Sequence, residues 1–244
     1  ATSLSETVEN FEIGSTSYFQ DVSNSKTSLR PELNSSYIDL DGTGQTVVVI
    51  DSGIDTDHSY FDDRIIYSKT FSNGPSNGED RGGHGTHVAG IIASSDSQFT
   101  GVAPGADIIA LKVFDPDGSG GIEEALQWCV ANAAQYSIDA VNLSLGVPIF
   151  FNQTENNTFL DYYGLGDEFS ALSDLDVVCV AAAGNSYDGV WDGEKFVDYY
   201  VITGAGEYDY YMASADTHSI QGISAPAAYP EVISVGATWG GPVG

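Results

Sequence analysis

The sequence predicts an α/β fold with a mainly parallel sheet and helices on both faces. Apolar runs of strand length recur along the chain, and segments with helical periodicity lie between them. Continuous β-branched runs bounded by turn residues are typical of strands buried on both faces of a parallel sheet. Strands that alternate with helices imply right-handed crossovers, which cover both faces of the sheet.

The first strand is expected at 45–51 (QTVVVID), directly after a turn. A helix is expected at 84–93 (HGTHVAGIIA), and a second at 121–135 carries Glu123 and Glu124 near its positive N-terminal end. Four further apolar runs predict strands at 108–114, 140–145, 177–183 and 232–237.

The chain has 244 residues, of which 42% are hydrophobic, and this suffices for one large core. Residues 1–43 are rich in Ser, Thr, Asn and acidic residues and predict an N-terminal arm ahead of a single domain at 44–244. Two long segments, 149–172 and 187–229, are aromatic, acidic and rich in turn residues. Such segments are often functional loops, and a surface insertion fits them equally well.

The chain is strongly acidic, with 35 Asp and Glu residues against 7 Lys and Arg residues and a formal net charge of −28. Nucleic acid and anionic membrane surfaces would repel it, so neither is an expected partner. No run reaches the roughly 18 apolar residues of a membrane helix. The acidity fits a secreted or salt-adapted surface, and it also fits an acidic cleft that attracts basic substrates.

The two cysteines, Cys129 and Cys179, both lie in apolar stretches. A free cysteine in such a place behaves as a small buried hydrophobic residue. Two reduced core thiols are therefore expected, with a disulfide as the alternative.

Polar residues at predicted strand ends and at a helix start are candidates for chemistry. Asp51 ends the first strand, where a carboxylate can meet another segment at the rim of the sheet or simply cap a loop. His84 opens a helix between glycines, and a carboxylate that fixed its tautomer would make it a general base. His87 stands three residues on, but no third ligand completes a zinc site, so no metal is expected. Asn185 follows a strand, where it can donate to an oxyanion or terminate a turn.

Three segments, VVVIDSGID, GGHGTHVAG and AAAGNS, occur in this order and resemble three of the four signatures of the subtilisin-like serine proteases, the subtilases. The similarity continues through GVAPGADIIALKVFDPDGSG, AVNLSLG and YPEVISVGAT and covers roughly residues 42–238. It implies a subtilisin-like three-layer fold and a serine endopeptidase that hydrolyses peptide bonds through an acyl-enzyme. Peptides or proteins are the implied substrates, and the chemistry requires no cofactor.

The resemblance assigns Asp51 to orient His84, and His84 to act as general base and then acid. Asn185 would be the side-chain donor of the oxyanion hole. A carboxylate oxygen of Asp51 is therefore expected within about 3.2 Å of a ring nitrogen of His84, with His87 packed internally. Substrate would contact two pocket walls, Ser144, Leu145 and Gly146 in one and Ala182, Ala183 and Gly184 in the other, and a strand-pairing edge formed by Gly118, Ser119 and Gly120.

The fourth family signature, a Gly-Thr-Ser-Met-Ala-like segment with the nucleophilic serine, does not occur in the sequence. The nearest substitute is GISAP at 222–226, but it precedes the VISVGAT strand, and its proline favours a loop around Ser224. We therefore expect a C-terminally incomplete catalytic domain that is inactive alone. A truncated sequence, one product of a nick, and a fragment completed by a separate C-terminal chain all fit. The alternative function is a catalytically inactive subtilase-like module that binds peptides or partners.

A structural calcium ion is compatible with the sequence but is not supported at the usual family site. Ser59 and Tyr60 follow His58 where a Pro-Asp pair is expected, and the segment SSDSQFTGVAP is short. Nearby carboxylates fit another hard-cation site or, more simply, solvated surface charge, and these are Asp55, Asp57, Asp62 and Asp63. The expected location is secreted or extracellular, and the acidic segments 149–172 and 187–229 predict basic or extended substrates.

Overall fold

The structure is a computed structural model of the 244-residue chain. It describes residues 40–72, 78–115, 118–146, 164–184, 190–191, 196–197, 200–202, 208–210 and 224–236. Nearly all of the predicted N-terminal arm, 1–43, lies outside these residues, so the arm and its boundary with the domain stay predictions.

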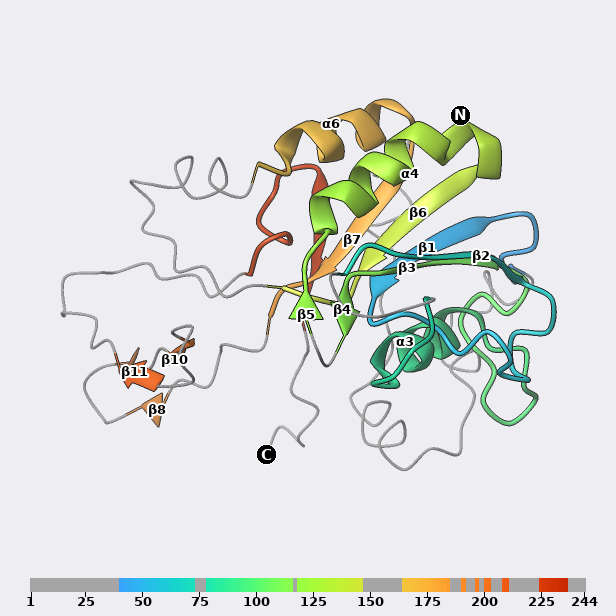
Figure 1. The fold of residues 1–244 in the computed structure, drawn as a ribbon, viewed down its shortest axis with the longest axis horizontal. Helices are drawn as coiled ribbons and strands as arrows, with labels where there is room; N and C mark the ends of the chain where they lie inside the picture. The colour runs from blue at the N-terminus through green and yellow to red at the C-terminus, as the bar shows by residue number, and fades with distance from the viewer. Residues whose placement is uncertain are drawn as a thin grey trace.

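A six-stranded sheet forms the centre of the molecule, with the strands in the order β12-β7-β6-β1-β3-β2 (Figure 1). All of its pairings are parallel. The predicted mainly parallel sheet is therefore confirmed. The strands are β1 (Thr46–Asp51), β2 (Ile65–Thr70), β3 (Asp107–Lys112), β6 (Ile138–Leu143), β7 (Val178–Ala182) and β12 (Val232–Val235).

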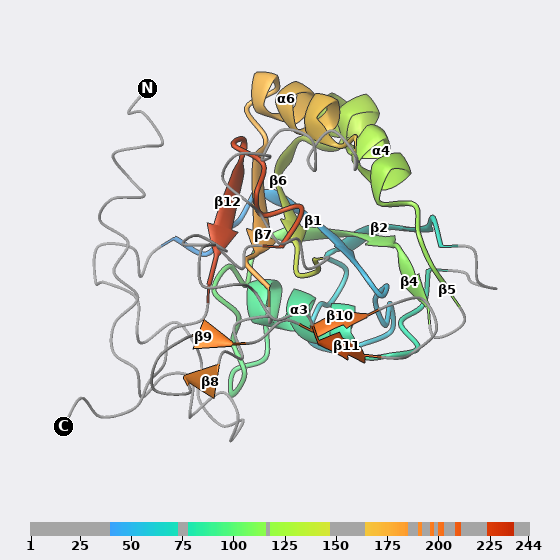
Figure 2. The same ribbon diagram turned by 90° about the vertical axis from the view of Figure 1, so that its left-hand side faces the viewer.

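Helices cover both faces of this sheet, which confirms the predicted three-layer arrangement. Helix α3 (His84–Ala93) lies on one face, and α4 (Ile122–Tyr136) and α6 (Gly166–Asp174) lie together on the other (Figures 1 and 2). Each face has its own buried cluster, because alternate residues of a strand point to opposite sides. Val49 packs toward α3, whereas Val48 packs toward α4.

Two elements of the three main layers, α6 and β2, were not predicted. Helix α6 begins at Gly166, so residues 166–172 of the segment 149–172 are helical and are not part of a loop. Its apolar face is short, with Phe169 and Leu172 as its buried hydrophobic residues, and so gives a weak periodic signal. Strand β2 was missed because all of its residues stay at least partly exposed, and Ser68 and Lys69 interrupt its apolar run.

Short antiparallel pairs complete the described elements. They are β4 (Phe114–Asp115) with β5 (Gly118–Ser119), β8 (Val190–Trp191) with β9 (Phe196–Val197), and β10 (Tyr200–Ile202) with β11 (Tyr208–Tyr210). The last two pairs fall within the long segment 187–229.

Both cysteines are free and buried, as predicted. Burial raises the pKa of Cys179 to about 12. Burial, and then the neighbouring Cys179, raise the pKa of Cys129 as well. The thiolate is the reactive form of cysteine, and a raised pKa keeps both thiols protonated and unreactive. Both side chains therefore serve the core as small hydrophobic groups.

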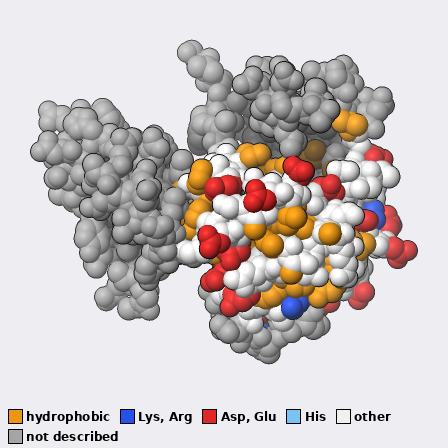
Figure 3. Space-filling model, turned by 90° about the horizontal axis from the view of Figure 1, so that it is seen from above, with side chains coloured by type: hydrophobic (Ala, Val, Ile, Leu, Met, Phe, Trp, Pro, Cys, Tyr) orange, Lys and Arg blue, Asp and Glu red, His pale blue; other side chains and the backbone are white. Residues whose placement is uncertain are grey.

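The surface carries the excess of acidic residues. Figure 3 shows acidic side chains spread over the face covered by α4 and α6, with few basic ones among them. Glu123 and Glu124 at the start of α4 and Asp167 at the start of α6 are exposed there. Among the described residues, no helix has the length and apolar character needed to cross a membrane.

Candidate active site

The carboxyl end of β1 is where the chain changes direction across the sheet, since β1 lies between β3 and β6. Ligand sites of open α/β sheets form at such switch points. Asp51 is the last residue of β1, and strand alternation points it to the face of Val49, beneath α3. His84 is the first residue of α3. The topology therefore brings these two side chains to one edge of the sheet.

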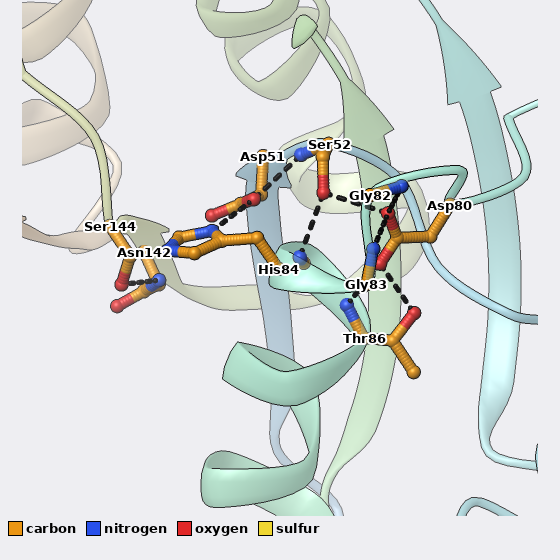
Figure 4. A network of polar contacts seen from close by, with 10 residues as sticks. Asp51, Ser52, Asp80, Gly82, Gly83, His84, Thr86, Asn142 and Ser144 are labelled. Atoms are coloured by element: carbon orange, nitrogen blue, oxygen red, sulfur yellow. Dashed lines mark hydrogen bonds and ion pairs between the residues drawn. The ribbon is translucent and has the colours of Figure 1, made fainter. Parts of the chain in front are cut away.

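The contact predicted between them is present: His84 Nδ1 lies 2.7 Å from Asp51 Oδ1 (Figure 4). Because a carboxylate only accepts hydrogen bonds, the proton of this bond belongs to Nδ1. The backbone N–H of Ser52 donates to the same oxygen at 2.7 Å. Asp51 Oδ2 is buried and has no hydrogen-bond partner in the described part of the chain.

Burial differs sharply between the two partners. The side chain of Asp51 is 1% exposed, whereas that of His84 is 60% exposed. The buried carboxylate thus fixes one edge of the imidazole, and the ring's other nitrogen, Nε2, lies outside this contact. An imidazole held in this way can accept a proton at Nε2 and keep the resulting positive charge beside a carboxylate.

A glycine permits α3 to begin so close to β1. A Cβ atom on Gly85 would overlap the carbonyl oxygen of Gly53 and lie 3.2 Å from Asp51 Cβ. Gly53 itself has φ +103°, a conformation that favours glycine. These glycines of the DSGID and GHGTH segments allow the close backbone approach that sets the distance between Asp51 and His84.

Asp80 holds the start of α3, and sequence reasoning missed it. Its Oδ1 accepts hydrogen bonds from the Ser52 hydroxyl at 2.9 Å and from the backbone N–H groups of Gly82 and Gly83 at 3.0 and 2.8 Å (Figure 4). Its Oδ2 accepts from the backbone N–H and the hydroxyl of Thr86, at 2.8 and 2.6 Å. The only sequence signal is an Asp shortly before a helix, and the usual capping position is occupied by Gly83.

The electrostatics of Asp80 follow from these bonds. Partial burial alone would raise the pKa of its carboxyl. The hydrogen bonds from Thr86, Gly83 and Ser52 outweigh that effect, so the pKa lies below its ordinary value. Asp80 is therefore a charged acceptor at the positive end of α3.

The two predicted pocket walls lie at the carboxyl ends of neighbouring strands. Residues 144–146 follow β6, while Ala182 ends β7 and Ala183 and Gly184 follow it. Because β6 and β7 pair in parallel, both segments leave the sheet at the same edge. Asn142 Nδ2 donates to Ser144 Oγ at 3.0 Å (Figure 4).

Ser224 lies against both walls. It is 2% exposed, and its N–H donates to the carbonyl of Ala183 at 2.8 Å. A Cβ atom on Gly146 would come 2.7 Å from Ser224 Cβ, and one on Gly184 would overlap Ser224 Oγ. Turn residues and not a helix follow Ser224, which confirms the expected loop. Ser224 and the two glycines are far apart in sequence, so only the structure reveals this contact.

The predicted substrate-pairing edge includes β5. Gly118 and Ser119 pair with β4, and the N–H of Gly120 donates to the carbonyl of Val113 at 3.0 Å. The sheet of β4 and β5 has two strands among the described residues, so a further strand has an edge to which it can add.

The prediction that His87 packs internally is wrong, because His87 is exposed. Residues three apart share one side of a helix, and His84 is exposed as well. A cavity of about 550 Å³ lies along α3 and is lined by His87, Ile91, Tyr60 and other residues, but not by Asp51 or His84.

Within the described segments, no group of three or more His, Cys, Asp or Glu side chains is placed to hold a metal ion. In the acidic stretch considered for calcium, Asp62 accepts a hydrogen bond from the Ser95 hydroxyl at 2.7 Å. The calcium hypothesis gains no support from this geometry.

Asn185, the predicted oxyanion donor, lies outside the described residues, directly after Gly184. Most of the acidic segments 149–172 and 187–229 lies outside them too. The roles predicted for these parts of the chain stay predictions.

The fold and the site define an α/β protein with an Asp–His pair already formed at the carboxyl edge of a parallel sheet. The profile of the subtilase family matches residues 42–239, and the chain belongs to that family. The resemblance noted in the sequence is thereby confirmed.

Several curated subtilases are similar to the chain. Subtilisin-like protease 9 of Arthroderma benhamiae is 33% identical over 220 residues, which are 82% of this chain and 52% of that protein. Serine protease AprX of Bacillus subtilis is 33% identical over 217 residues, 81% of this chain and 47% of its own length. The major intracellular serine protease of B. subtilis is 31% identical, over 80% of this chain and 51% of that protein.

The chain thus spans about half the length of the curated relatives it matches. Among solved structures, that of a cold adapted subtilisin-like serine proteinase aligns with 61% of this chain and 49% of its own at 31% identity, with a TM-score of 0.47.

Proposed function

We propose that this chain forms most of the catalytic domain of a subtilisin-type serine endopeptidase. The observation that carries the proposal is the 2.7 Å contact of His84 with the buried carboxylate of Asp51, at a switch point of the sheet and inside the subtilase match. Family membership supplies the reaction class, and this contact supplies the oriented base which that reaction needs.

In this proposal His84 Nε2 takes the proton of a serine hydroxyl while the hydroxyl oxygen attacks the peptide carbonyl carbon. The imidazolium, stabilised by Asp51, then gives that proton to the leaving amine. Water repeats the sequence on the acyl-enzyme, releasing the acid product and restoring the serine. Burial of Asp51 strengthens its attraction to the imidazolium, because little water reaches the carboxylate. Asn185 would donate to the oxyanion.

The nucleophile in this proposal is the serine of the fourth family signature, supplied after Gly244 or by a separate fragment. Ser224 is not proposed for the role, because it is buried against the pocket walls and carries its own structural contacts. An extended substrate would add to the edge formed by 118–120.

Ser224 also suggests which substrates the site accepts. It occupies the space between Gly146 and Gly184, so it would limit the depth of a pocket between the two walls. The completed enzyme should therefore prefer a small side chain at the residue before the cleaved bond.

The proposal is tested by a fluorophosphonate probe, which labels an activated serine. The chain alone should remain unlabelled, and the protein extended by the sequence that follows in its gene, or mixed with that fragment, should be labelled on the added serine. His84→Ala in the extended protein should abolish labelling. Labelling of Ser224 in the chain alone would overturn the placement of the nucleophile.

If the extended protein binds peptides but takes no label, the inactive binding module is the better description. The cellular location stays a prediction, since the matched relatives include a protease named as intracellular.

A further inference from the structure

Asp80 connects both neighbours of His84 to the end of β1. Gly83, on one side of His84, donates its N–H to Asp80 Oδ1 at 2.8 Å. Gly85, on the other side, donates its N–H to the Ser52 hydroxyl at 2.8 Å, and that hydroxyl donates to Asp80 Oδ1 at 2.9 Å. The backbone on both sides of His84 is therefore tied, directly or through Ser52, to one carboxylate.

Ser52 also ties this network to Asp51. Its backbone N–H donates to Asp51 Oδ1, the oxygen that accepts from His84 Nδ1, and both distances are 2.7 Å. Covalent and hydrogen bonds thus join four residues, Asp51, Ser52, Gly85 and His84, into a closed ring. Asp80 is bound to the Ser52 hydroxyl from outside this ring (Figure 4). A shift of Asp80 would move the hydroxyl that sets the spacing between β1 and α3.

A buried charge pair between β3 and β4 anchors the segment that carries Asp80. Lys112 Nζ donates to the carbonyl of Glu79 at 2.5 Å and lies 2.7 Å from Asp115 Oδ2, and neither Lys112 nor Asp115 has an exposed side chain. Arg81 lies 2.7 Å from Asp115 Oδ1. The residue before Asp80 is thus bound to the end of β3, and the residue after it is bound to β4.

This anchor is adjacent to the Asp–His pair in the sheet. Lys112 is the register partner of Asp51 on the neighbouring strand, and alternation points both side chains to the α3 face. The segment 79–81 therefore bridges β3 and α3 at the point where β1 presents Asp51.

We propose that Asp80 is the positioning residue of this site: through Ser52 and the first turn of α3 it holds His84 on Asp51, and the Lys112–Asp115 pair holds Asp80 in place. The inference deepens the proposed protease function and rests on it for its effect on reaction rate. A base that must take a proton from a serine needs its ring held to a fraction of an ångström. No substrate atom needs to touch Asp80 for this role.

The decisive variant is Asp80→Asn, which keeps the size of the side chain but cannot accept all of the bonds that the carboxylate accepts. The first readout uses the 244-residue chain: the low-field NMR signal of the proton between His84 and Asp51. We expect that signal to weaken or disappear in Asp80→Asn. Asp96→Asn is the matched control, because Asp96 likewise accepts from two backbone N–H groups, of Gln98 and Phe99, but at the far end of α3. Its low-field signal should be unchanged.

The second readout is the rate of fluorophosphonate labelling in the extended protein. Asp80→Asn should slow labelling by up to about 100-fold, the loss expected from a misplacement of roughly 1 Å. Ser52→Ala should slow it as well, and the double variant should be little slower than the worse single variant, because both changes break one path. If the slowing in the double variant equals the product of the slowing in the two single variants, the path through Ser52 is overturned.

A fold defect is separated from a positioning effect by comparing variants. If Asp80→Asn does not fold, Ser52→Ala decides alone, with the same two readouts. Retention of the low-field signal and of the labelling rate in a folded Asp80→Asn variant overturns the inference and leaves the protease proposal standing. If the unaltered extended protein takes no label while the low-field signal of the 244-residue chain still depends on Asp80, the protease proposal is overturned instead.

Discussion

Gly85→Ala should disrupt the site, although it adds only one methyl group. The new Cβ would overlap the carbonyl oxygen of Gly53 and lie 3.2 Å from Asp51 Cβ. Non-bonded heavy atoms rest at roughly 3.5 to 4.0 Å, so the first turn of α3 would have to retreat by about 1 Å. The 2.7 Å bond between His84 and Asp51 cannot stay intact through such a shift.

The expected size of the effect follows from that displacement. Overpacking of this kind costs about 1 to 3 kcal/mol of stability. A movement of roughly 1 Å at the base should slow labelling of the completed enzyme by about 100-fold. Gly90→Ala is the control, because it lies in the same helix and a Cβ there meets no atom within 4 Å. Alanine is favoured over glycine inside a helix by about 1 kcal/mol, so this variant should be stabilised.

Urea unfolding gives the stability of Gly85→Ala and Gly90→Ala, and fluorophosphonate labelling gives the reactivity of the completed enzyme that carries each substitution. The two identical substitutions, five residues apart, should have opposite signs in stability, and only Gly85→Ala should lose labelling. Equal stability of Gly85→Ala and the unaltered chain would refute the reasoning that close approach sets the site. Loss of labelling in Gly90→Ala would show that α3 responds to any added volume.

Ser224→Gly should open the space between the pocket walls and raise the ratio of cleavage after large residues to cleavage after small ones by at least about 10-fold, since each pocket methylene is worth roughly 1 to 3 kcal/mol. Peptide-library cleavage measures this ratio, and an unchanged ratio would contradict the placement of Ser224 in the pocket. Cys129 and Cys179 should resist iodoacetamide in the folded chain and react fully after unfolding, because burial raises both pKa values. The lowered pKa of Asp80 means that the unfolded carboxyl, with an ordinary pKa of 3.8, takes up its proton first as the pH falls. Asp80 therefore contributes stability above about pH 4, and this contribution is lost as the pH drops through the folded-state pKa. The free energy of unfolding should fall less steeply with decreasing pH in Asp80→Asn than in the unaltered chain. Equal slopes of unfolding free energy against pH in the two proteins would contradict this prediction.

The sequence alone predicts the parts of the structure that repeat a simple pattern. The strand with Asp51 is a continuous apolar run, and the helix with His84 keeps an apolar stripe of Val88 and Ala89. Their meeting at one edge follows from parallel topology. The order of the sequence motifs then identified Asp51 and His84 as a pair, and the observed distance of 2.7 Å between their side chains agrees with the predicted contact.

Contacts between distant segments could not be predicted in this way. Asp80 accepts bonds from Ser52 and Thr86, which lie on opposite sides of it in the sequence, and no local pattern encodes that. The mistake over His87 has another source, since a helix of alternating small and apolar residues gives a poor indication of which side faces solvent. The significance of Ser224 likewise comes only from two glycines distant in sequence, which follow β6 and β7.

The charges at this edge of the sheet also bear on why the pair can be buried. Asp51 and Asp115 both have almost fully buried side chains in a chain whose net charge is −28. Two of the 7 Lys and Arg residues, Lys112 and Arg81, lie here, and Lys112 is completely buried. A buried charge without a partner is costly, and breaking such a pair typically costs about 3 to 5 kcal/mol. Lys112 therefore offsets the local acidity next to Asp51, while its bond to Glu79 fastens the segment that orients His84, so one side chain supports both the charge balance and the geometry of the site.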